Sequence, residues 1–512
     1  MIDSPLFNIE GGIFLLGEEN MKWKIIVDGN KSKVESKSHL IILNKISELS
    51  IFDNVTICNN LYKVKNTTTV NGSAISVNKR KINIYGGEIS NNILEIYVDK
   101  NSNESILPEK MESNYIYEVK GAGISLTCSK LYMYGGIICY NEGINNTDIS
   151  SNKNSTNNNS KLYGLNQCCL GIAILSENYS KLYLYKGEIS NNYAKNNGKL
   201  KLVEPKENTI TKLSQINNCI YGSALYLANS EFEMFDDFII QNNSPIHNSI
   251  LTIEKNCKIS GKILSSIRGG QIYANATQIK IHGGTIQNSN NDSNSIINVA
   301  TEEEEIKKSI QAIDIGGGID FTNCKDIQIN NLKIINCNST DGGAIYLYDS
   351  SLKISNSELN NNSAQHNGGA IFSANSCEVD LYNTKIINNH TKENGGGIFS
   401  KGNLIIDGEN NIISNNEAGF NGGGITFYTH CLVKNCNICN NKAKHFGGGI
   451  CANGDLLLEK AKIYLNSCDV KEGGGGIYYG NSIILFDKNK IDSLVYDNSA
   501  ATKRNNFSPE IN

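Results

Sequence analysis

The chain contains 512 residues, of which 39% are hydrophobic and 19% are charged, and its formal net charge is −4. This charge is not basic enough to predict a nucleic-acid partner, and the hydrophobic fraction excludes wholesale disorder. No apolar run approaches the roughly 20 residues that a membrane-spanning helix needs, so we expect no membrane span. Residues 1–10 lack a basic region followed by an apolar core, so we expect neither an export signal nor an anchor. The chain therefore either stays in the cell or is a piece of a longer surface protein.

The counts of glycine, proline and cysteine restrict the fold further. The chain has 47 glycines but 5 prolines, which favours strands joined by tight corners, because proline removes ladder hydrogen bonds. Its 15 cysteines are odd in number and scattered, so they predict neither a disulfide framework nor a metal site. Cys436 and Cys439 form one C-x-x-C pair without a second pair at zinc-finger spacing. We interpret the cysteines as small buried hydrophobic residues and expect no metal and no cofactor.

The N-terminal half contains weak copies of a repeat. One copy lies at residues 11–14, and a second coil extends to a Gly-Ser-Ala-Ile corner at residues 72–75. An alternating strand pattern with a Gly-Gly turn then begins at residue 81 and recurs from residues 130 and 278, and from residue 181 with Lys-Gly in place of Gly-Gly. The apolar residue that ends each glycine-containing corner recurs about every 47 to 51 residues, at Ile75, Ile124, Ile174, Leu225, Ile272 and Ile319.

Two explanations of these long intervals remain open. Each interval contains either a second, degenerate coil or a long loop that follows the Asn-Asn corner. Residues 249–253 and 257–261 alternate like strands, so we expect a coil there. Residues 145–160 are almost wholly Asn, Ser, Thr, Asp and Lys, which predicts a mobile loop. We interpret the acidic run at residues 302–305 as a solvated loop.

The C-terminal half repeats regularly. Between residues 359 and 450 the unit is [Ile/Leu]-x-Asn-Asn-x-[Ala/Thr], a short spacer, and then Gly-Gly-[Ala/Gly]-Ile. From Ile319 onward, the isoleucine recurs about every 25 to 27 residues, at Ile345, Ile371, Ile398, Ile425, Ile450 and Ile477. A fixed period of this length is typical of a solenoid.

These patterns predict an all-β chain that forms a single-stranded, right-handed parallel β-helix with three short strands per coil. A coil of about 26 residues leaves no room for a crossover helix, so each strand must pair with its counterpart in the next coil. The paired asparagines are expected at corners, because Asn tolerates left-handed backbone and can form amide ladders. We expect one domain over residues 1–500, with degenerate coils and long polar insertions over 1–315 and regular coils over 316–486. Residues 501–512 are expected to form a disordered tail.

The pairing of a Gly-Gly-Ala-Ile element with a hydrophobic-x-x-Asn element, once per coil, resembles the repeats of chlamydial-type polymorphic membrane proteins and related β-helix surface proteins. The elements at residues 342–345 and 368–371 match fully, and the resemblance covers most of residues 57–477. In place of the Phe of the family's second element, this chain has Ile or Leu. The resemblance implies an extracellular or cell-surface adhesion role.

A polysaccharide-active enzyme is the alternative, because the pectate-lyase-like superfamily shares this fold. Polygalacturonase-like hydrolases carry Asn-Thr-Asp, Asp-Asp, Gly-His-Gly and Arg-Ile-Lys elements on successive coils. Asn146, Thr147 and Asp148 match the first element, and Asp236 with Asp237 matches the second. They lie about 90 residues apart and the other two elements are absent, so we interpret the match as chance.

Two charged columns are further candidates. Asp380 and Asp407 each lie nine residues after a corner isoleucine, so we expect them to be stacked neighbours, followed by Lys434 and Glu459. Paired carboxylates can bind calcium or share a proton, but the alternating charge favours a solvated ion-pair ladder. A corner column is expected to contain His366, Glu393, Phe420 and His445, which would place His366 beside Glu393 as a surface pair or an acid–base pair.

Aromatic residues give the candidate binding site. Six of them directly follow a corner isoleucine or leucine and are expected to form a stripe, namely Tyr226, Tyr273, Tyr346, Phe372, Phe399 and Tyr478. Tyr134 and Tyr185 are expected to begin a second stripe. Rings at strand spacing suit sugar faces or a protein partner, whereas the alternative is that they stack only to stabilise the ladder. We therefore expect a non-catalytic scaffold that binds glycans or proteins of a host or neighbouring cell surface.

Overall fold

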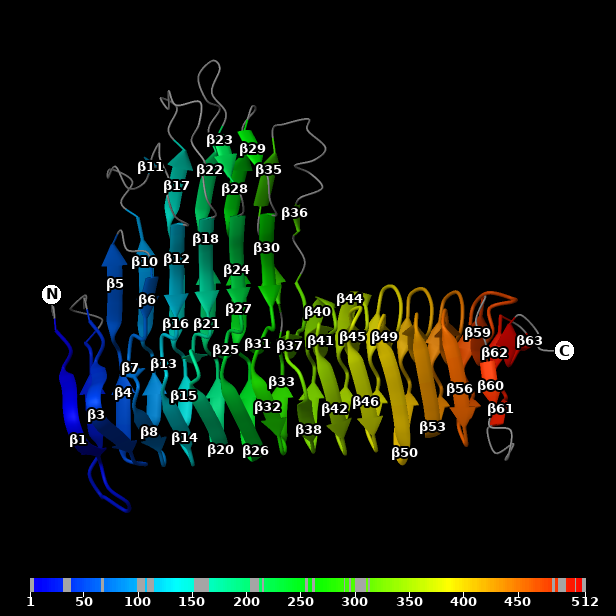
Figure 1. Cartoon of the computed structure of the whole chain (residues 1–512), viewed down its shortest axis with the longest axis horizontal. Coiled ribbons are helices and arrows are strands. Elements are labelled where there is room, and N and C mark those ends of the chain that lie inside the picture. Colours follow the sequence, from blue (N-terminus) through cyan, green and yellow to red (C-terminus); the bar gives the residue numbers. More distant parts are fainter. Residues whose placement is uncertain are drawn as a thin grey trace.

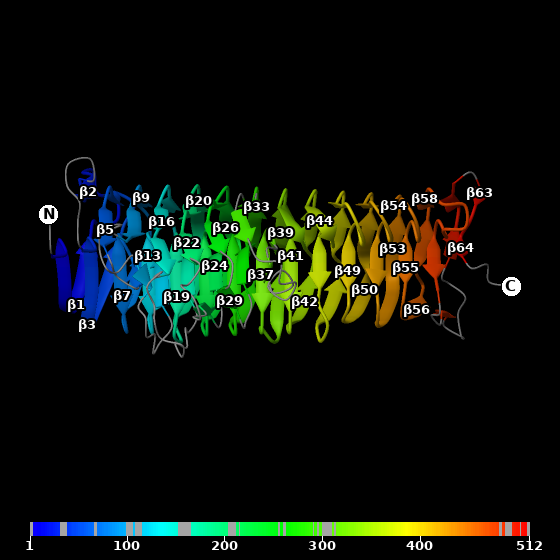
Figure 2. The ribbon, with the colours of Figure 1, turned by 90° about the horizontal axis from the view of Figure 1, so that it is seen from above.

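The computed structural model describes residues 4–30, 38–65, 69–98, 106–107, 115–151, 165–202, 211–213, 216–253, 257–259, 263–289, 291–293, 296–299, 310–311, 314–480, 484–486, 494–501 and 503–508. The regular structure of these residues is entirely β-strand. Successive coils stack along one long axis, and their strands pair in parallel with the strands of the next coil (Figure 1, Figure 2). The protein is a parallel β-helix, as the sequence predicts.

Three strand positions line the core of each coil. The first face contains β7 (Ile75–Asn78), β13 (Ile124–Thr127), β19 (Ile174–Glu177), β25 (Leu225–Ala228), β31 (Ile272–Asn275), β37 (Ile319–Thr322), β41 (Ile345–Tyr348), β45 (Ile371–Ser373), β49 (Ile398–Ser400), β52 (Ile425–Phe427), β55 (Ile450–Ala452), β59 (Ile477–Tyr479) and β64 (Phe507–Ser508). The second face contains β8 (Lys81–Ile84), β14 (Lys130–Met133), β32 (Gln278–Ile281), β38 (Ile327–Asn330), β42 (Ser351–Ser355), β46 (Glu378–Tyr382), β56 (Asp455–Glu459) and β60 (Ile484–Phe486). The third face contains β2 (Ile25–Asp28), β4 (Val55–Cys58), β9 (Glu88–Ser90), β15 (Ile137–Cys139), β33 (Gly284–Gln287), β39 (Leu332–Ile335), β43 (Glu358–Asn360), β47 (Lys385–Ile387), β57 (Lys462–Tyr464) and β61 (Leu494–Tyr496).

Several long strands run through a corner without a break and join two faces. Strands β1 (Phe7–Leu16) and β3 (Ile41–Ile51) join the first and second faces. The second and third faces are joined by β20 (Lys181–Ser190), β26 (Glu231–Gln241), β50 (Asn403–Ser414) and β53 (His430–Cys439). These continuous strands merge the three faces into one sheet of 37 strands.

Alternation along each strand places the core inside the coils. In β46 the side chains of Val379 and Leu381 are buried, whereas those of Glu378 and Asp380 point outward. The same alternation repeats from coil to coil, so the inward Ile, Leu, Val and Phe residues form one continuous cluster along the whole helix. Each fully buried side chain of this kind contributes roughly 1.5 to 3 kcal/mol before the entropy cost is subtracted.

The regular coils carry a fourth, short strand beyond the three that the sequence predicts. It follows the asparagine corner and comprises β40 (Asn338–Asp341), β44 (Ser363–Asn367), β48 (His390–Thr391), β51 (Glu417–Ala418), β54 (Lys442–Ala443), β58 (Ser467–Cys468) and β62 (Ser499–Ala500). Strand β63 (Lys503–Arg504) adds to the end of this sheet, antiparallel to β62. Residues 503–508 are therefore not a disordered tail. They form β63 and β64, and β64 pairs with β59 at the C-terminal end of the helix.

The N-terminal coils carry a second structure at this same position, which we call the lateral sandwich. Its outgoing strands are β5 (Leu61–Lys65), β10 (Ile93–Tyr97), β16 (Glu142–Asn146), β21 (Tyr193–Asn196), β27 (Ser244–His247) and β34 (Asp292–Ser293), continued by β11 (Ile106–Leu107), β17 (Asp148–Ser151), β22 (Lys199–Leu202), β28 (Ile250–Ile253) and β35 (Ile296–Val299). Its returning strands are β6 (Thr69–Asn71), β12 (Tyr115–Lys120), β18 (Leu165–Leu170), β24 (Ile216–Tyr221), β30 (Ile263–Arg268) and β36 (Ile310–Gln311), and β23 (Thr211–Leu213) pairs with β29 (Cys257–Ile259). The lateral sandwich rises from one side of the N-terminal half (Figure 1).

The lateral sandwich decides between the two explanations of the long intervals. Ile75 pairs directly with Ile124, and Ile124 pairs with Ile174, so about 50 residues make one coil and not two. The insertion follows the Asn-Asn corner, but it is built of paired strands with their own buried core, which includes Leu94, Val119 and Ile220.

Two predictions of local structure change accordingly. The alternating segment around residues 249–253 is not an extra coil, because β28 pairs with β22 and β35 inside the lateral sandwich. Residues 145–151, expected to begin a mobile loop, lie mostly in β16 and β17, and Asn145 and Thr147 are buried. The rest of that segment and residues 302–305 lie outside the described residues.

Candidate binding surface

The paired asparagines form the corners, as predicted. The first asparagine of each pair adopts left-handed backbone, with φ of 55° at Asn361 and 57° at Asn388. The second asparagine is buried and forms a ladder, in which Nδ2 of Asn389 donates to Oδ1 of Asn416 at 2.9 Å and Nδ2 of Asn416 donates to Asn441 at 2.9 Å. The motif is therefore structural, and a binding function has to lie elsewhere on the coils.

The six predicted aromatic residues occupy one column on the first face. Tyr346, Phe372 and Phe399 are neighbours with ring centroids 5.0 and 5.3 Å apart. Tyr226 and Tyr273 form a separate pair, because Asp320 occupies the next position. Tyr478 is separated from Phe399 in this column, because Thr426 and Cys451 fill the two positions between them, and its ring stacks instead on Phe446 with centroids 4.5 Å apart. The expected stripe is thus three groups.

These rings are poorly accessible. Tyr273, Phe372 and Phe399 are buried, with exposed fractions of 5%, 8% and 4%, and Tyr226, Tyr346 and Tyr478 are half-buried. Burial raises the pKa of Tyr226 and Tyr273 far above the usual value for a tyrosine. The ring faces pack against one another and against Tyr221 of the lateral sandwich, whose centroid lies 4.8 Å from that of Tyr273. This column stabilises the coils and exposes little ring surface to a ligand.

The second predicted stripe is longer and more exposed. It begins at Phe52 and continues through Tyr85, Tyr134, Tyr185, Phe235 and His282, one ring per coil at the corner between the second and third faces. We call this set the aromatic ladder. Neighbouring centroids lie 4.5 to 5.3 Å apart and the planes are inclined by 4° to 20°. Tyr85 and Tyr134 are 45% and 41% exposed, so ring edges and hydroxyls line the surface.

A second row of aromatic and charged side chains flanks the aromatic ladder on the second face. Tyr132 and Tyr183 stack with centroids 4.9 Å apart, and Tyr132 lies 6.3 Å from Tyr134. The Tyr183 hydroxyl donates to Glu231 at 2.6 Å. Hydrogen bonds from Lys181 and then from Tyr183 hold the pKa of the Glu231 carboxyl below its usual value, so it stays ionised. Together these rows form a polar aromatic surface that spans the N-terminal coils.

A groove lies beside the N-terminal end of the aromatic ladder. It has a volume of about 590 Å³ and is lined by Met21, Lys22, Trp23, Lys24, Asp53, Asn54, Val55, Thr56, Gly87, Glu88, Gly136 and Ile137. Its floor includes Gly87, where φ is +83° and a Cβ atom would lie 2.5 Å from the Val55 carbonyl oxygen. Trp23 belongs to this lining and is 77% exposed, so most of its indole is accessible to a ligand. The groove therefore combines an apolar ring with carboxylate and ammonium groups.

The charged column differs from the prediction in one member. Asp407, Lys434 and Glu459 are neighbours, and Lys434 Nζ lies 3.8 Å from Asp407 and 3.5 Å from Glu459. Asp380 is not in this column, because it pairs with Ile405, while Asp407 pairs with Tyr382. The turn that precedes Glu378 has two more residues than the turn that precedes Asn403. Residues at the same distance from the corner isoleucine therefore lie two positions apart on the second face. The column is an exposed ion-pair ladder without a carboxylate pair.

The corner column of His366, Glu393, Phe420 and His445 is present. The backbone N–H groups of Glu393, Phe420 and His445 each donate to the carbonyl of the column member one coil earlier, at 2.8 to 3.1 Å. The rings of Phe420 and His445 stack with centroids 4.1 Å apart. This column stabilises a corner of the regular coils.

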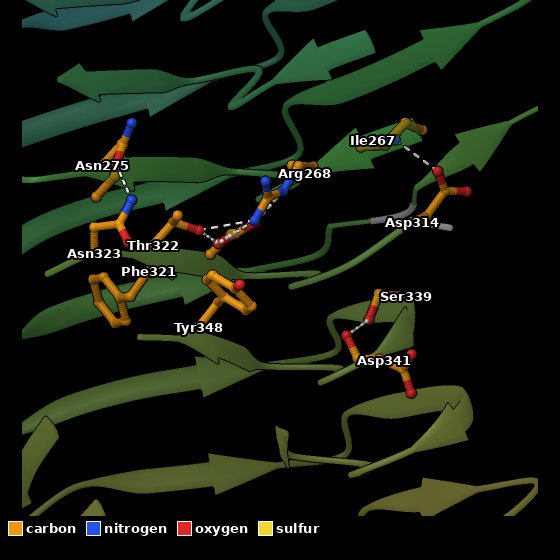
Figure 3. Close-up of polar contacts among 12 residues, drawn as sticks. Ile267, Arg268, Asn275, Asp314, Phe321, Thr322, Asn323, Ser339, Asp341 and Tyr348 are labelled. Carbon is orange, nitrogen blue, oxygen red and sulfur yellow. Dashed lines mark hydrogen bonds and ion pairs between the residues drawn. The ribbon is translucent and has the colours of Figure 1, made fainter. Parts of the chain in front are cut away.

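One polar cluster was not anticipated from the sequence. Where the lateral sandwich ends, Nε of Arg268 donates to Asp320 Oδ2 at 2.8 Å, and Nη2 of Arg268 donates to the Thr322 hydroxyl at 2.8 Å (Figure 3). Asp320 is fully buried, and burial raises the pKa of its carboxyl although Arg268 opposes the shift. The Arg268 guanidinium also lies 5.3 Å from the centroid of Tyr273. Its enclosed position indicates a structural junction rather than a substrate site.

Two further aspartates lie near this junction. Oδ1 of Asp314 accepts the Ile267 N–H at 2.7 Å (Figure 3). Oδ1 of Asp341 accepts the Asn367 N–H at 3.0 Å. Burial raises the pKa of Asp341 above its usual value. Each carboxylate thus satisfies backbone donors where the chain returns from the lateral sandwich to the regular coils.

The two sequence elements that match polygalacturonase-like hydrolases lie in different parts of the fold. Asn146 lies in the lateral sandwich, whereas Asp237 lies on β26 and pairs with Lys186. Among the described residues, no group of three or more His, Cys, Asp or Glu side chains could hold a metal ion. Cys436 and Cys439 are buried, and burial raises the pKa of Cys436 far above the usual value for a thiol. Both behave as core residues.

Comparison with protein-family models, curated proteins and solved structures finds no match. In the part of the chain that the structure describes, no helix is long and apolar enough to cross a membrane. The functional argument therefore depends on the geometry of the exposed surface.

Proposed function

We propose that the protein is a non-catalytic β-helix scaffold that binds extended glycans along the aromatic ladder and serves adhesion at a cell surface. The observation that supports this function most directly is the aromatic ladder of six rings from Phe52 to His282, one in each of six successive coils. It is independent of the resemblance to surface proteins, which points to the same class.

The spacing of the aromatic ladder suits a repetitive ligand. Strands of neighbouring coils lie about 4.8 Å apart, so the hydroxyls of Tyr85, Tyr134 and Tyr185 recur at a fixed short interval on an exposed edge. A sugar chain presents alternating apolar C–H surface and hydroxyl groups. The tyrosines of the aromatic ladder suit both, because the exposed ring edges contact the apolar surface and the hydroxyls exchange hydrogen bonds.

The groove would hold one end of such a chain. Trp23 supplies an accessible apolar ring, whereas the rings of the aromatic ladder cover one another's faces, and Asp53 and Glu88 supply acceptors for sugar hydroxyls. The protein needs no catalytic group for this role.

The test is binding of the full chain to an array of linear polysaccharides, followed by the triple variant Tyr85→Ala, Tyr134→Ala, Tyr185→Ala. These positions point outward, so we expect the variant to fold and to lose at least about tenfold in affinity, the scale of one or more lost aromatic anchors. The matched control is Tyr348→Ala with Tyr382→Ala, which removes two tyrosines that are 52% and 54% exposed in the C-terminal half. Circular dichroism and thermal unfolding establish that all variants are folded.

Two results would contradict the proposal. If the triple variant binds glycans as tightly as the unmodified chain, the aromatic ladder is not the binding surface. Release of unsaturated sugars from uronate polymers by the purified chain would replace the scaffold with the polysaccharide-active enzyme that the fold also permits.

A further inference from the structure

The second face carries an aliphatic stripe at the C-terminal end of the helix. In four successive coils the same outward position is occupied by Ile405, Leu432, Leu457 and Leu485. Ile405 and Leu485 are 41% and 51% exposed, and Leu432 and Leu457 are half-exposed. Strands β50, β53, β56 and β60, which carry these residues, lie side by side (Figure 1). We call these four side chains the aliphatic stripe.

The aliphatic stripe contrasts with the rest of its own column. In the four preceding coils this position is occupied by Lys280, Gln328, Lys353 and Asp380, all of which are polar. An outward strand position in contact with water needs no apolar side chain, and contiguous exposed apolar patches mark interaction sites. The change from polar to aliphatic residues over four consecutive coils therefore indicates a buried contact.

Charged residues border the aliphatic stripe on both sides. On one side His430 lies beside Asp455, with Nδ1 of His430 3.4 Å from the carboxylate, and on the other side Lys434 lies 3.5 Å from Glu459. On each border the basic residue belongs to the coil of Leu432 and the acidic residue to the coil of Leu457. This order makes the surface complementary to its own copy.

We propose that the aliphatic stripe is the interface of a two-fold symmetric dimer in which two copies of this chain pack with their helix axes antiparallel. A two-fold axis between the coils of Leu432 and Leu457 places Leu432 of each copy against Leu457 of the other. The same rotation brings Lys434 opposite Glu459, and His430 opposite Asp455. In the alternative, with the axes parallel, Glu459 would face Asp455, and like charges across an interface are disfavoured. Charge therefore selects the antiparallel arrangement.

The dimer goes beyond the proposed glycan binding and does not depend on it. The overlap is confined to the last coils, so the two N-terminal halves point away from each other and both aromatic ladders stay accessible. Two ladders in one particle would strengthen attachment to a surface with many glycans through effective concentration.

Sedimentation of the full chain across the micromolar range tests the proposal. We expect a monomer–dimer equilibrium, and Leu457→Glu should raise the dimer dissociation constant at least about tenfold, because it places a carboxylate in the centre of an apolar contact. Lys353→Glu is the matched control, since it changes an exposed residue of the same column outside the aliphatic stripe. It should leave the equilibrium unchanged. Thermal unfolding confirms that each variant keeps the β-helix.

A charge exchange tests the antiparallel geometry. Lys434→Glu alone and Glu459→Lys alone should each weaken the homodimer, because each places like charges opposite one another. An equimolar mixture of the two variants should restore dimers, because both opposed pairs in the mixed dimer are then Glu against Lys. A wild-type chain that stays monomeric at every concentration would overturn the proposal, as would a mixture that stays as weak as its components.

Discussion

The corner between the second and third faces has different chemistry in the two halves of the molecule. In the N-terminal half it carries Phe52, Tyr85, Tyr134, Tyr185, Phe235 and His282. In the C-terminal half the same column carries Asn330, Ser355, Tyr382, Asp407, Lys434 and Glu459. The inward residues and the asparagine ladders are alike in both halves, so the coil core fixes the fold and the outward positions are free to differ.

The two halves meet at Arg268, and the largest expected effect comes from breaking this junction. Arg268→Ala leaves the fully buried Asp320 without its cationic partner. Removing one partner of a buried ion pair costs about 3 to 5 kcal/mol, and we expect this loss in the free energy of unfolding measured with urea. Lys325→Ala removes an exposed pair with Asp349 and should cost at most about 1 kcal/mol. Equal losses in the two variants would show that Arg268 has no special role.

The asparagine ladder should be equally important in both halves. Asn192 and Asn416 make matching contacts, since Nδ2 of each donates to the next asparagine, at 2.8 and 2.9 Å. Alanine at either position leaves buried donors and acceptors unpaired, which costs about 1 to 3 kcal/mol. We expect the two variants to lose similar unfolding free energies in denaturant titrations. A loss in one half alone would mean that the ladders are not equivalent.

The aromatic ladder should contribute to stability where the ion-pair ladder does not. Tyr134→Ala removes the stacking contacts with Tyr85 and Tyr185 and the longer contact with Tyr132. An aromatic pair contributes about 0.5 to 1.5 kcal/mol, so we expect a loss of about 1 to 3 kcal/mol. Asp407→Asn in the same column should change stability by less than about 0.5 kcal/mol, because its pair with Lys434 is exposed. Thermal unfolding of both variants measures the difference, and a larger loss from Asp407→Asn would reverse this ranking.

The smallest effect concerns pH at the start of the regular coils. Burial raises the pKa of Asp341 in the folded protein, so the charged carboxylate costs stability at neutral pH. This cost disappears as the pH falls through the folded-state pKa, because the folded protein then binds the proton. Asp341→Asn should therefore stabilise by about 0.5 kcal/mol at neutral pH and by nothing in acid. A gain that persists in acid would assign the effect to packing.

Much of this fold could be predicted from the sequence, because the residues of the repeat have distinct structural roles. Gly-Gly and Asn-Asn fix the corners, and the alternation of Ile and Leu fixes the inward faces. The lateral sandwich could not be predicted in the same way. Its strands and the junctions between them contain buried polar residues, such as Asn145, Thr147 and Gln167, which bond to one another and hide the alternation.

The candidate surface could be predicted only in part. Tyr134 and Tyr185 indicate the aromatic ladder, but Phe52 and Phe235 lie in segments without the glycine-containing turn that follows the other rings. The burial of Phe372 and Phe399 depends on packing between coils, which no spacing in the sequence reports. The aliphatic stripe could not be predicted, because Ile405, Leu432 and Leu457 each stand between two buried apolar residues, and such an unbroken apolar run does not show which side chain points outward.

The unbroken asparagine ladder from Asn362 to Asn506 makes the length of this protein adjustable in whole units. Each rung bonds to the neighbouring rungs and to a backbone carbonyl of the coil before it, and these contacts repeat from coil to coil. Loss or duplication of one complete coil would therefore leave every remaining rung with a partner of the same kind. The distance between the aromatic ladder and the aliphatic stripe could thus change by one strand spacing at a time without a new core being designed.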